Sequence, residues 1–186
     1  MNRLVIIPDE AHEALGFSMK ARLAGIAREI NAHNLAHVMG SHALRSFNSA
    51  AEVQESDLLL WASDGNDFVV ALATRLPKEE IEGRARADEQ EGMIARVMGS
   101  GRSETAASDD LEAADWTNLE TLRGMKIDAM AASPVFLFES CTLVLSRVRY
   151  GGKHTDKLSA PSELASLLGR LIEDRLIRAT LGVESL

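Results

Sequence analysis

The sequence predicts an α+β fold in which helices pack on an antiparallel sheet. Two features carry this prediction. Two apolar runs flank the turn sequence Asp64-Gly65, and a long apolar stretch extends from Lys126 to Tyr150. Amphipathic helical periodicity precedes the first feature and follows the second. A block of strands between terminal helices is typical of folds in which helices cover a sheet.

The first predicted element is a long amphipathic helix, because apolar residues recur at three- and four-residue spacing. These residues are Leu15, Met19, Leu23, Ile26 and Ile30. Asp9 and Glu10 suit its N-terminus, where acidic side chains cap the helix and favour its dipole. A second helical segment extends to Phe47, and we expect breaks or kinks at 31–34 and at Gly40.

A β-hairpin follows, formed by Asp57–Ala62 and Phe68–Thr74 around a turn rich in aspartate, glycine and asparagine. Pro77–Gln90 is charged and helix-prone, and Gly92–Met98 is expected to form a short helix. The segment Arg102–Leu119 is polar and is expected to be irregular.

Two or three apolar strands are expected between Lys126 and Tyr150, separated by the polar pair Glu139-Ser140. Pro134 should stop the first of them or lie on an edge, because proline donates no ladder hydrogen bond. Pro161 suits the first turn of a final helix. A broad apolar stripe marks that helix: Leu164, Leu167, Leu168, Leu171, Ile172, Leu176 and Ile177.

Composition limits the possible functions. A chain of 186 residues, 46% of them hydrophobic, fits one domain with a sizeable core. The net charge of −8 disfavours nucleic acid as a partner, because a polyanion is repelled. No apolar run reaches the roughly 20 residues needed to cross a bilayer, and no signal-peptide pattern is present, so we expect no membrane partner. Cys141 is the single cysteine, which excludes an intrachain disulfide and fits a reducing cytoplasm.

The order of these motifs, over roughly Leu23 to Leu181, resembles that of GAF domains. The matching segments are 58–74, 76–81, 91–97, 103–105, 108–110 and 129–134. The resemblance implies a central antiparallel sheet with N- and C-terminal helices on one face and an irregular crossover on the other. It implies a short strand at 103–105, and it divides the chain into a lead-in (1–22), one domain (23–182) and a tail (183–186).

The resemblance also implies a stand-alone sensory or regulatory domain that binds a small molecule or a partner protein. Such a domain would form a homodimer through its terminal helices and signal to a further protein that the sequence does not identify. The implied pocket lies between the sheet and the crossover. Its candidate residues are Met93, Asp110, Trp116, Ser133 and Cys141. Small residues in Ala129–Ser133 leave room for such a pocket, and they would equally allow close helix packing.

Departures from the family pattern narrow the function. The cyclic-nucleotide signature of the family is not found, and bilin-binding members carry a cysteine in the crossover, whereas Cys141 lies in a predicted strand. Members that reduce methionine sulfoxide use several cysteines. The sequence shows no catalytic constellation and identifies no cofactor, so we expect a protein that is not an enzyme. Two interpretations of Cys141 are open. It would be a redox sensor if a nearby cation stabilised its thiolate. Otherwise it is a small buried residue of the strand.

The histidines support an alternative. Segment 34–42 resembles the phosphoacceptor helix of some histidine kinases, so His37 or His42 could serve a phosphotransfer or kinase-associated signalling protein. No ATP-binding segment follows it. His33 and His37 have the spacing of a metal-binding pair, but no third ligand is evident, so no metal site is expected. A third interpretation is a protein-interaction module without a ligand.

Overall fold

The computed structural model describes residues 9–52, 56–74, 81–107, 109–111, 118–151 and 156–182. Its strands form one antiparallel sheet in the order β3-β2-β1-β6-β5-β4. The strands are β1 (Asp57–Ser63), β2 (Phe68–Ala73), β3 (Arg86–Ala87), β4 (Glu104–Ala107), β5 (Ile127–Leu137) and β6 (Ser140–Tyr150). The helices are α1 (Asp9–Arg28), α2 (Leu35–Glu52), α4 (Gly92–Ser100), α5 (Leu119–Arg123) and α6 (Ser162–Thr180).

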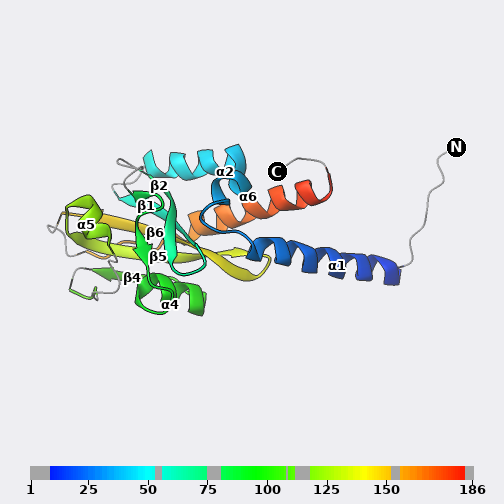
Figure 1. Ribbon diagram of the computed structural model, residues 1–186, viewed down its shortest axis with the longest axis horizontal. Helices are drawn as coiled ribbons and strands as arrows, with labels where there is room; N and C mark the ends of the chain where they lie inside the picture. The colour runs from blue at the N-terminus through cyan, green and yellow to red at the C-terminus, as the bar shows by residue number, and fades with distance from the viewer. Residues whose placement is uncertain are drawn as a thin grey trace.

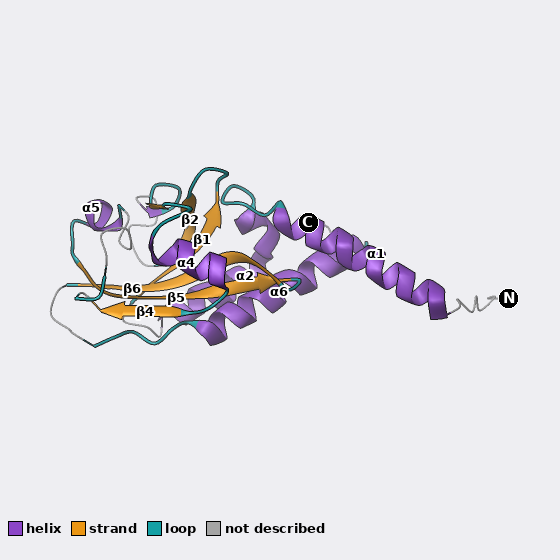
Figure 2. Cartoon of the chain, turned by 90° about the horizontal axis from the view of Figure 1, so that it is seen from below, coloured by secondary structure: helices purple, strands orange, loops and turns teal. Residues whose placement is uncertain are grey.

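The helices and the sheet form layers, as the α+β prediction requires. Figure 1 shows α2 and α6 on one side of the sheet and α4 on the other, with α1 extending away from the body. Figure 2 shows the same arrangement from below. The predicted α+β class is therefore confirmed. No helix in the described ranges combines the length and apolar character needed to cross a membrane.

The predicted hairpin is confirmed as β1 and β2, which pair antiparallel from Leu59–Ala73 to Ser63–Phe68. Its turn is fixed by Asp64, whose carboxylate accepts hydrogen bonds from the backbone N–H groups of Asp67 (3.0 Å) and Asn66 (3.1 Å). These two bonds lower the pKa of Asp64, because they favour the charged carboxylate.

One core lies between the sheet and the helices α1, α2 and α6. Its buried apolar residues include Leu23, Ala27, Leu35, Met39, Phe47, Leu58, Leu60, Val135, Leu145, Leu168, Ile172 and Leu176. The predicted break falls between α1 and α2, where the Asn34 side chain accepts a hydrogen bond from the Asn31 N–H at 2.9 Å. The expected kink is present at Gly40, which has φ 65° and ψ 177° within α2.

A second core lies on the opposite face, under α4 and α5. It includes Leu59, Trp61, Met93, Ile94, Val97, Leu111, Leu119, Met130, Val144 and Val148. The indole N–H of Trp61 donates to the hydroxyl of Ser146 at 2.8 Å, so the one polar atom of this buried ring is satisfied. The sheet is thus buried on both faces.

The structure corrects three details of the strands. β5 does not stop at Pro134 but continues to Leu137, since pairing with β4 ends at Ala132 and Pro134 lies where that edge is free of β4. The break between the long strands is Phe138-Glu139, one residue earlier than expected. The stretch expected to be irregular contains β4, close to the strand that the family resemblance implied at 103–105.

Candidate functional site

The structure does not bring the five predicted pocket residues together. Met93 is 1% exposed and belongs to the core under α4. Asp110 is exposed and forms an ion pair with Lys157 at 2.8 Å. Cys141 is half-buried on β6, opposite Phe136. Trp116 lies outside the described residues.

Ser133 lies on the other face of the sheet from Met93, which corrects the prediction that the two share a pocket. Side chains alternate along β5, and Met130 and Ala132 belong to the core under α4, so Ser133 faces the helix side. There its hydroxyl lies 2.9 Å from that of Ser103 and 3.1 Å from that of Ser162 at the start of α6. These three hydroxyl groups satisfy one another and join the residue before β4 to β5 and α6.

The small residues of β5 serve chain packing on the helix side. Ala129 and Ala131 are fully buried and cluster with Leu158, in the segment that leads to α6. Further along, Gly169 of α6 lies so close to β5 that an added Cβ would be 2.6 Å from the carbonyl oxygen of Phe136. On this face, the space left by small residues is filled by the chain itself.

Cys141 does not have the properties of a reactive thiol. Burial raises its pKa to about 11, so the thiol is protonated at neutral pH. A redox sensor requires the thiolate, which a nearby cation would stabilise. The structure therefore favours the interpretation of Cys141 as a small, partly buried residue of the strand.

Charged groups are also buried at the end of the sheet that α5 covers. The Arg123 guanidinium lies 3.0 Å from the Asp57 carboxylate, with side chains 15% and 7% exposed. The same guanidinium lies over the ring of Tyr150, 5.0 Å from its centre, an arrangement that favours a cation. Burial and the nearby Asp57 raise the pKa of Tyr150. This cluster fixes α5 to the sheet.

His33, His37 and His42 are exposed, as a phosphoacceptor would have to be. His33 lies before α2, beside a shallow pocket lined also by Asp64 and Arg86. His37 and His42 lie on either side of the kink at Gly40. Among the described residues, no three His, Cys, Asp or Glu side chains form a group that could hold a metal ion.

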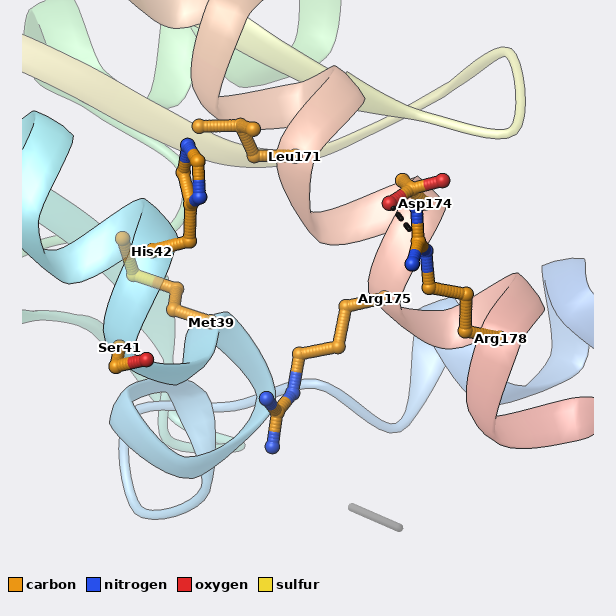
Figure 3. Close-up of a pocket in the computed structure, with 7 residues that line it drawn as sticks. All are labelled: Met39, Ser41, His42, Leu171, Asp174, Arg175 and Arg178. Atoms are coloured by element: carbon orange, nitrogen blue, oxygen red, sulfur yellow. Dashed lines mark hydrogen bonds and ion pairs between the residues drawn. The ribbon is translucent and has the colours of Figure 1, made fainter. Parts of the chain in front are cut away.

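His42 lines a cleft between α2 and α6 that the sequence did not indicate. The cleft has a volume of about 300 Å³, and its lining residues are Met39, Ser41, His42, Leu171, Asp174, Arg175 and Arg178 (Figure 3). Asp174 and Arg178 form an ion pair at 2.8 Å, one helical turn apart on α6. The sequence signal that could have pointed here is Gly40, an isolated glycine in a helical pattern.

The Arg175 guanidinium extends from α6 to the kinked turn of α2 (Figure 3). An added Cβ at Gly40 would collide with this guanidinium, and φ 65° with ψ 177° is a backbone conformation open essentially to glycine alone. Gly40 thus allows α2 to kink and Arg175 to lie against it. The cleft combines two guanidinium groups, an imidazole and a hydroxyl with an apolar wall.

Comparison with known proteins establishes the fold and no more. No family model matches the sequence, and no curated protein matches it. Among solved structures, the GAF domain of an Acinetobacter phosphoenolpyruvate-protein phosphotransferase has a TM-score of 0.54 at 11% identity, covering 92% of this chain and 98% of that one. The corresponding GAF domain from Coxiella burnetii gives 0.52 at 12% identity, covering 82% and 98%.

A third similar structure is a free methionine-R-sulfoxide reductase from Neisseria meningitidis, solved with its substrate. It has a TM-score of 0.50 at 14% identity and covers 98% of this chain and 100% of that one. These identities are too low to carry over an activity or a ligand. Together with the six-stranded antiparallel sheet and its helical layer, they show that the chain has the GAF fold.

Proposed function

We propose that this chain is a sensory or regulatory domain that binds a small molecule or a partner protein and signals through dimer contacts of its terminal helices. The observation that carries the proposal is the GAF fold combined with a first helix whose side chains from Gly16 to Arg22 are mostly exposed. The fold supplies a rigid sheet for a binding site, and the uncovered helix supplies a surface for a second copy.

The exposed part of α1 supports the dimer. From Gly16 to Arg22 every side chain is exposed except Met19, which is half-buried, and Phe17 is 76% exposed. A helix of this length is marginally stable in water unless its apolar side packs against something. Leu181, just after the end of α6, is also 56% exposed. A second copy of the chain would cover these residues in a two-fold contact.

The test is the molar mass of the purified chain by size-exclusion chromatography with light scattering. We expect a dimer for the wild type and a shift to monomer for Phe17→Glu, which places a charge in the contact. Met125→Glu is the matched control, because Met125 is 47% exposed and follows α5, away from the terminal helices. A wild-type monomer, or equal masses for the two variants, would contradict the dimer.

For the small molecule, we propose a site on the α4 face of the sheet, where the resemblance to GAF domains implies a pocket. Ser133 is not part of it, since it faces the helices. Native mass spectrometry of the freshly purified chain should detect a bound small molecule. An interaction module without a ligand predicts instead a bare mass and an unchanged melting temperature across a metabolite panel, because any ligand that prefers the native state stabilises it.

Histidine phosphotransfer is a second candidate, and one observation favours His42 over His37 as the acceptor. His42 lines the cleft that contains Arg175 and Arg178, and guanidinium groups stabilise a phosphoryl group. Incubation with a cognate kinase and labelled ATP should then give an acid-labile phosphate that His42→Asn removes and His37→Asn retains. Absence of label from both histidines eliminates this function.

A reductase activity like that of the Neisseria protein is not part of the proposal. The chain has one cysteine, and its thiol is protonated at neutral pH. A single protonated thiol offers neither a ready nucleophile nor a second sulfur to resolve an oxidised intermediate.

A further inference from the structure

We infer that the cleft between α2 and α6 is a binding site for a small organic anion. The carboxylate or phosphate group of the ligand pairs with Arg175 and Arg178, and its apolar part contacts Met39 and Leu171. This site lies in the helical layer, on the opposite side of the sheet from the crossover. It exists whether or not the crossover pocket holds a ligand or the chain is a dimer.

Charge is the first argument. The whole chain carries −8, so its mean field repels anions. Yet the seven residues that line this cleft include two arginines and only one carboxylate, so the local charge is positive. The guanidinium of Arg175, at the turn before Ser41, adds a planar set of donors that matches a carboxylate or a phosphate.

The backbone of α2 strengthens this positive character. The helix is interrupted at Gly40 and resumes at Ser41, so a new helix N-terminus begins at the edge of the cleft. Ser41 and His42, the first two residues after the kink, line the cleft. The N-terminal end of a helix favours negative charge, and the Ser41 hydroxyl and the His42 ring can also donate hydrogen bonds.

Size and polarity narrow the ligand to a small organic anion. A volume of about 300 Å³ is at the lower end of small-molecule sites and is too small for a dinucleotide. Met39 is almost fully buried and Leu171 is half-buried, so the wall can accept a short apolar chain. An inorganic ion would use the charged half of the cleft and leave the apolar half empty.

Three probes separate these contributions in a titration of the full chain, followed by NMR chemical shifts at constant ionic strength. Butyl phosphate offers the anion and the apolar chain, inorganic phosphate the anion alone, and 1-butanol the chain alone. Butyrate repeats the first probe with a carboxylate. We expect saturable binding of butyl phosphate or butyrate, with chemical-shift changes confined to residues of α2 and α6. Inorganic phosphate should bind more weakly, and 1-butanol should not bind.

The deciding variant is Ser41→Asp, which places a carboxylate in the cleft. It should fold, because Ser41 is exposed and an acidic residue is favourable in the first turn of a helix. Ser166→Asp is its match, an exposed serine of α6 that changes the net charge equally outside the cleft. We expect Ser41→Asp to weaken binding by about tenfold or more and Ser166→Asp by less than about twofold.

A second pair tests the arginine directly. Arg175→Gln should abolish saturable binding, while Arg170→Gln, an exposed arginine of the same helix outside the cleft, should not. The inference is overturned if neither butyl phosphate nor butyrate saturates, if their shifts fall outside α2 and α6, or if Ser41→Asp binds like Ser166→Asp. None of these results bears on the dimer or on a ligand under the crossover.

Discussion

The close contact of α6 with β5 predicts an unusual result for a glycine in a helix. Gly169 is buried within α6, and the nearest atoms to an added Cβ would be the Phe136 carbonyl oxygen at 2.6 Å and the Val135 Cγ1 at 3.6 Å. In a helix interior, glycine to alanine normally stabilises by about 1 kcal/mol. Here the added Cβ would be fixed to the backbone of α6 and would meet a backbone carbonyl of β5, so no side-chain rotation removes the contact.

The magnitude follows from these two opposing effects. A Cβ contact of 2.6 Å is well inside the 3.0 Å below which something must shift, so helix and strand must separate by several tenths of an ångström. Overpacking of this kind costs typically about 1–3 kcal/mol. Gly169→Ala should therefore lower the free energy of unfolding despite its better helix propensity.

Gly25→Ala is the matched control. Gly25 lies in α1, and no atom lies within 4 Å of an added Cβ, so the propensity gain is the only effect expected. The difference between the two variants isolates the steric cost, which we expect to be about 1–3 kcal/mol in urea unfolding at 25 °C. In a chain of this size that corresponds to roughly 2–12 °C in melting temperature. Equal stability of the two variants would refute the close approach of α6 to β5.

Three further predictions concern stability. Glu139→Gly should raise the free energy of unfolding by about 0.5 kcal/mol or more, because Glu139 has φ 69° and a left-handed non-glycine residue costs roughly 1–2 kcal/mol; an unchanged urea midpoint would contradict it. Arg123→Met should cost about 3 kcal/mol by leaving Asp57 buried beside an apolar group, and Asp57→Asn in the same chain should recover part of that loss. Cys141 is protonated in the folded state up to a pKa of about 11, against 9.0 for an ordinary thiol, so its contribution is complete below pH 9 and is lost as the pH rises from 9 to 11. The stability difference between the wild type and Cys141→Ser, which does not titrate there, should shrink over that range.

The sequence predicted those parts of the fold that local chemistry determines. The Asp64 turn specifies its own hydrogen bonds, so the first hairpin was predictable from a few residues. Gly40 was recognised as a kink because glycine is costly inside a helix. β3 has only two residues, paired with Phe68 and Val69, and such a strand is determined by its partner rather than by its own sequence.

The face on which Ser133 lies was harder to predict, because a shift of one residue turns every side chain of a strand to the other face. The β5–β6 pairing contains irregularities between Ile127 and Ala129 and between Val135 and Phe136, which no local pattern announces. The cleft was missed for another reason. Its residues lie on α2 and α6, about 130 positions apart in the sequence, and only tertiary packing brings them together.

Helix α6 connects the features of functional interest. Within about two turns, Gly169 lies against β5, the Glu173 carboxylate accepts the Phe138 N–H of the β5–β6 turn at 2.5 Å, and Arg175 reaches the kink of α2. Because these three contacts are made by one helix, a displacement of α6 at any one of them would disturb the other two. Packed interfaces of this kind shift between discrete arrangements rather than deform continuously. A bound anion would therefore act on the position of α6, against which α1 also packs.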